Sequence, residues 1–197
     1  AGRWSYRPGR AAAPLFADES ARLGAPVVHH ENTFYDYNRE PLMPHRLSTE
    51  GPALASGDVN GDGLDDLYVG GAKWQAGTLL LQQHDGTFRP SPQPALAADS
   101  LAEDVDAAFF DADGDGDQDL YVVSAGNEFW GDAEALEDRL YVNDGRGAFR
   151  RNAKALPPLH ENGSCVVPGD FDGDGDMDLF VGSRVVAREY GAAPRSH

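Results

Sequence analysis

The chain has 197 residues, and its 33 acidic residues against 16 Lys and Arg give a formal net charge of −17. This charge argues against a nucleic-acid partner, which requires a basic face. The absence of any run of 18 apolar residues excludes a membrane-spanning helix. The single cysteine, Cys165, excludes an internal disulfide and a cysteine-based metal motif.

Residues 1–52 are predicted to form an N-terminal lead-in, made of a tail and at most one outer strand. The first ten residues carry three arginines among aromatic residues, and we interpret them as a tail rather than a nucleic-acid-binding arm. Four residues of the lead-in, His29, His30, Glu31 and His45, could form a metal or acid–base site. Packing of these side chains within the lead-in is the favoured interpretation, so we assign them no role.

Three nine-residue windows share one acidic pattern: DVNGDGLDD from Asp58, DADGDGDQD from Asp111 and DFDGDGDMD from Asp170. They hold 14 of the 33 acidic residues, and without those 14 the net charge would be −3. The acidity is therefore concentrated in these windows and is not a general property of the surface. In each window, glycine occupies positions 4 and 6, and side chains with an oxygen ligand occupy positions 1, 3, 5 and 9.

This alternation lets a short loop curl around one hard cation. Calcium takes six to eight oxygen ligands at about 2.3–2.6 Å, and glycine permits the positive φ angles of a tight loop. Four carboxylates within about 4 Å repel each other by roughly 4 kcal/mol per pair at an effective dielectric constant near 20, so such a cluster requires a cation. Position 7 changes chemical type between the copies, so we expect it to contribute its backbone carbonyl. The sequence therefore predicts about three calcium sites, one per repeat, with the ligands Asp58, Asn60, Asp62, Leu64, Asp66, Asp111, Asp113, Asp115, Asp117, Asp119, Asp170, Asp172, Asp174, Asp176 and Asp178.

The windows argue against two alternatives to calcium loops and leave one open. Zinc does not fit, because the windows contain no Cys or His. An EF-hand does not fit either, since its loop requires a Glu at position 12 between two helices, whereas position 12 here is Val69, Val122 or Val181. Magnesium is the closer alternative, but it requires stricter octahedral geometry and retains several waters.

Each window lies between two short segments that are typical of strands. The ninth residue of each window is the first residue of an apolar tetrapeptide, DLYV, DLYV or DLFV. The segments ALASGD, DAAFFD and CVVPGD lead into the windows. Two further pairs of predicted strands, residues 78–83 with 87–89 and residues 139–142 with 148–150, flank Asp-Gly turns. Each repeat is therefore predicted to contain four strands, with the calcium loop joining the first two.

The windows begin 53 and 59 residues apart, a period typical of stacked supersecondary units such as propeller blades. The stretches 90–94 and 131–138 are predicted to be connecting loops, the second with room for one helical turn. Because so little helix is predicted between the strands, an all-β propeller of four-stranded blades is favoured over an α/β fold. We expect an incomplete fragment of about three blades over residues 53–197, with repeats at about 53–100, 101–160 and 161–197, the last one truncated.

The motif D-x-[DN]-G-D-G-x-x-D followed by an apolar strand resembles the FG-GAP/VCBS repeat family, whose blades are similar to those of the integrin α-subunit propeller. The segments from Val28 to Asp58 and from Asp138 to Phe149 resemble more specifically the bacterial ASPIC/UnbV and CRTAC1-like group. This resemblance implies a calcium-stabilised propeller, usually exported and often of seven blades, with its metal ligands in the three windows. It implies no catalytic residues.

These features predict a calcium-dependent module that binds a protein or glycan ligand outside the cytoplasm. We expect a secreted, periplasmic or cell-surface adhesion or protein-binding module, with its signal peptide outside this sequence. The alternatives are a lectin-like glycan-binding propeller and a scaffold domain of a larger exported enzyme. No catalytic motif is present, so no enzymatic activity is expected. The open edges of an incomplete propeller also predict self-association.

Overall fold

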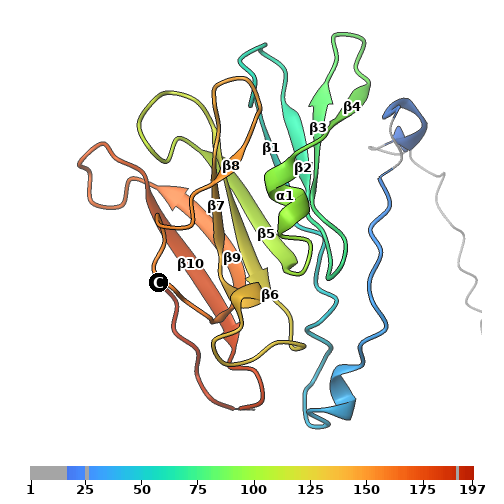
Figure 1. Cartoon of the computed structure of the whole chain (residues 1–197), viewed down its shortest axis with the longest axis vertical. Helices are drawn as coiled ribbons and strands as arrows, with labels where there is room; N and C mark the ends of the chain where they lie inside the picture. The colour runs from blue at the N-terminus through green and yellow to red at the C-terminus, as the bar shows by residue number, and fades with distance from the viewer. Residues whose placement is uncertain (1–16, 25–26, 190) are drawn as a thin grey trace, which may run out of the picture.

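A computed structural model describes residues 17–24, 27–189 and 191–197, and it shows a row of antiparallel sheets (Figure 1). The first sheet has the strand order β1-β2-β3-β4, the second has the order β5-β6-β7-β8, and the third pairs β9 with β10. The strands are β1 (Leu54–Gly57), β2 (Asp66–Val69), β3 (Thr78–Gln82), β4 (Phe88–Ser91), β5 (Glu103–Phe110), β6 (Asp119–Ala125), β7 (Arg139–Val142), β8 (Arg150–Arg151), β9 (Asn162–Gly169) and β10 (Asp178–Val185).

Within each sheet, every strand pairs with the next strand in the chain, so the two complete sheets are four-stranded meanders. This is the arrangement of propeller blades, and the nearly all-β, propeller-like fold predicted from the sequence is confirmed. The described sheets do not close into a ring (Figure 1). Beside the third sheet, the end of the chain pairs with β10, where the Val181 amide donates to the His197 carbonyl at 2.7 Å and the Val181 carbonyl accepts from the His197 amide at 2.9 Å.

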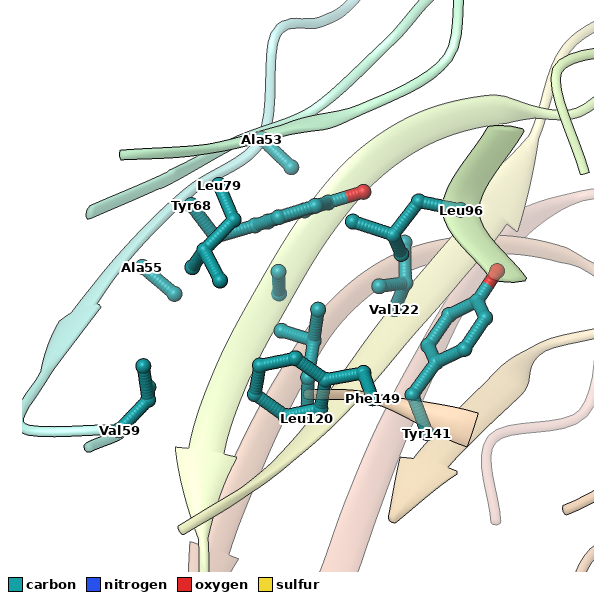
Figure 2. Packing of buried hydrophobic residues seen from close by; sticks show 11 residues of the cluster. Ala53, Ala55, Val59, Tyr68, Leu79, Leu96, Leu120, Val122, Tyr141 and Phe149 are labelled. Atoms are coloured by element: carbon teal, nitrogen blue, oxygen red, sulfur yellow. The ribbon is translucent and has the colours of Figure 1, made fainter. Parts of the chain in front are cut away.

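The second sheet lies between the other two, and its strand β6 is buried along its whole length. Leu120 and Val122 point into the core against the first sheet, which Figure 2 shows around Tyr68 and Tyr141. The alternate residues, Tyr121 and Val123, belong to a separate core against the third sheet. Successive side chains of a strand point to opposite faces, so the continuous apolar run of β6 results from burial on both faces.

A buried ion pair within the second sheet forms the centre of a network that reaches the first sheet. Arg139 Nη2 donates to Asp104 Oδ1 at 2.5 Å, and both residues are almost fully buried. The other carboxylate oxygen of Asp104 accepts bonds from the Tyr68 hydroxyl at 2.7 Å and the Gly71 amide at 2.6 Å. Since Tyr68 and Gly71 belong to the first repeat and Asp104 and Arg139 to the second, this network fastens one blade to the next.

The described part of the lead-in crosses the ends of the first two sheets. It contains the 3-10 helices η1 (Ser20–Arg22) and η2 (Asp36–Asn38) and no strand. Gln75, after β2, accepts a bond from the His30 amide and donates to the Val28 carbonyl. Further along, Arg39 Nη1 donates to two carbonyls after β6, those of Asn127 and Glu128. The predicted basic tail at Arg3, Arg7 and Arg10 lies outside the described residues.

The connection between the first two sheets differs from the prediction. Residues 90–94 are not all loop, because β4 continues to Ser91 and the helix α1 (Pro94–Ala98) begins after two further residues. Pro90 is tolerated within β4 because β4 is an edge strand. Pro94 is tolerated at the start of α1 because the first turn of a helix needs no backbone N–H donor there. The second predicted loop contains the 3-10 helix η3 (Glu134–Leu136), the single turn that was expected. Within the described ranges, none of the helices is long and apolar enough to cross a membrane.

Candidate metal-binding loops

The three acidic windows form the connections β1–β2, β5–β6 and β9–β10, hereafter the first, second and third acidic loops. All three lie at the same end of the sheets, which fan in Figure 1 so that the first loop is at the top, the second at the upper left and the third at the left. The position-1 carboxylate organises each loop: in the first, Asp58 Oδ1 accepts from the Gly61 amide at 2.8 Å and Oδ2 from the Gly63 amide at 2.8 Å. Asp111 and Asp170 accept the same two bonds in their loops. Gly61 and Gly63 have φ angles of 74° and 84°, which glycine adopts without strain.

Positions 3 and 5 form short local turns that hold their side chains at the loop surface. Asn60 Oδ1 accepts from the Asp62 amide at 2.9 Å, and Asp62 Oδ1 accepts from the Leu64 amide at 2.9 Å. The third loop repeats both bonds, from Asp172 and Asp174. Asx turns of this kind are set by sequence-local chemistry, so the repeated sequence produces a repeated backbone.

Two of the loops gather three carboxylates at one point. One oxygen each of Asp111, Asp113 and Asp115 lie within 4.8 Å of one another in the second loop, and the third loop brings together Asp170, Asp172 and Asp178 in the same way. The first loop forms no such group of three carboxylates among the described residues; there, position 3 is the amide Asn60. The structure thus brings the predicted ligands of the second and third loops together most closely.

Position 9 anchors the first two loops to the rest of their blades. Asp119 is fully buried, and its two oxygens accept bonds from the Ala112 amide at 2.9 Å and from the Asn143 amide, just after β7, at 2.8 Å. Asp66 bonds in the same way to Val59 and to Gln82, at the end of β3. Asp178, by contrast, is exposed and accepts one bond, from Phe171 at 3.1 Å. Position 9 therefore joins the loop to the third strand in the two complete blades.

Asn143 has a connecting role that its place in a predicted turn does not indicate. Its side-chain Nδ2 donates to the Val59 carbonyl in the first acidic loop at 2.8 Å and to the Gln118 carbonyl in the second at 3.0 Å. Its Oδ1 accepts from the Gly147 amide at 3.0 Å, which closes the β7–β8 turn. One buried amide thus connects two loops of neighbouring blades, a contact that no spacing within one repeat could indicate.

Two overlapping segments, residues 58–122 and 111–181, match the family model described as the FG-GAP-like repeat. Together they span more than half of the chain and contain all three acidic loops. The chain belongs to the FG-GAP-like repeat family. No curated protein matches it.

Burial and mutual repulsion set the electrostatics of these FG-GAP-like loops. Burial, followed by the charges of Asp115 and Asp119, raises the pKa of Asp117 to about 6. Burial also raises the pKa of Asp119, against its two backbone hydrogen bonds. For Asp58, slight burial opposes ionisation, but several loop amides together lower its pKa below the ordinary value. Loop amides therefore favour the ionised form of Asp58 in the first loop, whereas like charges oppose ionisation of Asp117 in the second loop, and a bound cation would relieve that repulsion.

The geometry of the loops fits a calcium ion. At calcium–oxygen distances of about 2.3–2.6 Å, two ligands on opposite sides of the ion lie about 5 Å apart at most. The gathered carboxylates of the second and third loops already meet that limit at 4.8 Å. The donor set consists of oxygens alone, as a hard cation prefers. The role predicted for position 7 (Leu64, Asp117 and Asp176), that of a backbone carbonyl ligand, stays a prediction. The side-chain carboxylate of Asp117 lies against Gly145, and one of its oxygens is buried without a hydrogen-bond partner among the described residues.

The four lead-in residues singled out in the sequence do not form one cluster. His45 Nε2 lies 3.6 Å from Glu50, and the His30 backbone bonds to Gln75. His29 and Glu31 do come together, with Nε2 2.7 Å from Oε1, and they meet Glu103 at the start of β5. Burial, followed by the charge of Glu31, raises the pKa of Glu103 to about 8. Sequence reasoning missed Glu103 because its partners come from a different segment of the chain.

Proposed function

We propose that this protein is a calcium-stabilised FG-GAP-like module that acts outside the cytoplasm in adhesion or protein binding. The observation that carries the proposal is the convergence of carboxylates in the acidic loops, where three oxygens lie within 4.8 Å in two successive repeats. Each loop would hold one Ca²⁺ through positions 1, 3, 5 and 9 and the carbonyl of position 7. Extracellular calcium is abundant enough to fill such sites even at affinities of about 10⁻⁴–10⁻³ M.

The role of the ion in this proposal is structural. Position 1 already organises the loop through its amide bonds, and position 9 reaches the third strand through Gln82 or Asn143. A cation between these carboxylates removes their mutual repulsion, so it stabilises both the turn and its attachment to the blade. No chemical step is assigned to the ion, and we propose a binding module without enzymatic activity.

The proposal is tested by removing and restoring the metal. Calcium at ten times its dissociation constant stabilises the folded state by about 1.4 kcal/mol per site, so three sites supply about 4 kcal/mol. For a domain of this size, EDTA should lower Tm by about 10 °C. Calcium should restore Tm more effectively than an equal concentration of magnesium. Asp115→Asn should reduce the number of bound calcium ions by one, whereas Asp132→Asn, an exposed carboxylate outside the loops, should not. An unchanged Tm in EDTA contradicts a structural ion.

The binding surface that we assign lies at the opposite end of the sheets from the acidic loops. Trp74, after β2, is 72% exposed and has a φ of 71°, which is strained for a residue other than glycine. Arg188, the other such residue in the described ranges, has a φ of 69° and lies over the Trp130 ring at 3.4 Å from its centroid. Backbone strain clusters at functional sites, and exposed tryptophans are common anchors of interfaces.

The exposed tryptophans also favour the second candidate, a lectin-like glycan-binding propeller. Glycan-array binding in calcium distinguishes the two, with Trp74→Ala as the test variant and Leu42→Ala, exposed in the lead-in, as its control. If the protein binds glycans on the array and Trp74→Ala removes this binding while Leu42→Ala does not, the glycan alternative is supported. If the folded protein binds no glycan on the array, the protein-binding proposal is supported. The remaining alternative function is a scaffold domain of a larger exported enzyme. Membership of the ASPIC/UnbV and CRTAC1-like group stays a prediction from the sequence.

A further inference from the structure

A second group of metal-ligating side chains lies at the other end of the second sheet from its acidic loop. Glu103 is the first residue of β5, opposite Ala125 at the end of β6, whereas the acidic loop joins the other ends of these strands. His29 and Glu31 reach Glu103 from the lead-in, and one ligand atom of each of the three residues lies within 4.8 Å of the others. This group therefore shares no residue with the acidic loops.

The buried carboxylate of this group has no partner for one of its oxygens. Glu103 is only 2% exposed, and its Oε1 accepts no hydrogen bond from the described residues. Its other oxygen, Oε2, accepts one bond, from the Lys73 amide at 3.2 Å. One ring nitrogen of His29, Nδ1, is likewise buried without a partner in the described ranges. A buried oxygen without a donor destabilises the folded state, and more so when it is charged, so the free oxygen requires an explanation.

The neighbouring cations do not supply that explanation. Lys73 forms its ion pair with Glu128, and Arg139 forms its own with Asp104. In the part of the chain that the structure describes, the only ion pair of Glu31 is with His29, and Glu103 has none. When both are ionised, the two carboxylates next to one imidazole place excess negative charge in a partly buried position, and a bound divalent cation would balance it.

The donor set points to a particular class of metal. An imidazole nitrogen with two carboxylates suits zinc and similar transition metals, whereas calcium prefers oxygen ligands alone. Tetrahedral ligands at about 2.0–2.1 Å from zinc lie about 3.3 Å apart. His29 Nε2 and Glu31 Oε1, now 2.7 Å apart, would need to separate by about half an ångström. Gly51 leaves room for the imidazole, because a Cβ there would lie 3.3 Å from His29 Cε1.

We propose that His29, Glu31 and Glu103 bind one divalent transition-metal ion of the zinc class, which fastens the lead-in to the second sheet. Three protein ligands leave one tetrahedral position for water. The site is independent of the acidic loops in residues, donor type and location, so it stands or falls separately from the calcium sites.

The test is zinc binding by the full chain, stripped of metal with a chelator and then supplied with excess Ca²⁺ to fill the acidic loops. Isothermal titration of this calcium-loaded protein with Zn²⁺ should show one zinc-binding site. His29→Gln and Glu103→Gln should each weaken zinc binding by at least about 100-fold, the upper end of the effect of losing even an outer-shell partner. Both variants should keep the far-ultraviolet circular dichroism spectrum of the unchanged protein, which shows that they are folded.

Two other histidines supply matched controls. His45 lies near Glu50, and His160 Nε2 lies 3.0 Å from Glu137, so each could attract zinc to the surface. His45→Gln and His160→Gln should leave the zinc affinity unchanged. The proposal is overturned if the unchanged protein binds no zinc, or if a control variant weakens zinc binding as much as His29→Gln does. Since His29 belongs to the lead-in and not to a sheet, its replacement tests the site even if Glu103→Gln does not fold.

Discussion

Replacing Asp119 separates the anchoring role of position 9 from its predicted role as a metal ligand. Asp119→Ala removes an acceptor of two backbone amides in a fully buried place, whereas Asp178→Ala removes an exposed acceptor of one. Hydrogen bonds to a charged group contribute about 1.5–3 kcal/mol each, and the burial that raises the pKa of Asp119 offsets part of that gain. We therefore expect Asp119→Ala to lower the free energy of unfolding by about 3 kcal/mol and Asp178→Ala by less than about 1 kcal/mol.

The measurement is urea unfolding followed by far-ultraviolet circular dichroism, first in EDTA so that metal binding does not contribute. A loss of about 3 kcal/mol lowers the midpoint by about 1–3 M urea at slopes typical of small proteins. In calcium, the loss for Asp178→Ala should grow, because position 9 would then also be a metal ligand. Equal losses for the two variants in EDTA would refute the argument that the bond to Asn143 anchors the second loop.

Three further outcomes follow from the contacts between and beyond the blades. Asn143→Ala should lower the free energy of unfolding by about 2 kcal/mol and speed amide exchange in the first acidic loop, since its Nδ2 bonds across the blades; unchanged exchange there contradicts the bridge. Asp104→Asn should cost about 3–5 kcal/mol in urea unfolding because it leaves the buried guanidinium of Arg139 unpaired, and Asp104→Asn with Arg139→Met should recover part of that loss. Phe180 is exposed on the outer face of the third sheet and should support self-association. Phe180→Ser should therefore lower the sedimentation coefficient at high protein concentration, whereas Leu42→Ser should not. If the unchanged protein is monomeric at every concentration, this prediction is wrong.

The sequence predicted the strand positions well because their signals are local. The turn chemistry of each window ends at position 9, and β2, β6 and β10 begin at that residue in all three repeats. The strand β7 was predicted at the residues it occupies, next to an Asp-Gly turn. The helix α1 was missed because its five residues follow a proline-rich stretch that is typical of a loop, and the burial of Leu96 against the first core decides its conformation.

The sequence by itself determined what nine neighbouring residues can do: the glycines and alternating oxygens fold each acidic loop through bonds between near neighbours. Only the tertiary structure decided how the ninth residue of each similar loop is buried. Asp119 is buried and Asp178 exposed, because the donor that reaches Asp119, the Asn143 amide, comes from a strand beside the loop and not from the loop itself. The meeting of His29 with Glu103 has the same origin, since packing of the lead-in on the sheet ends joins residues that no local pattern relates.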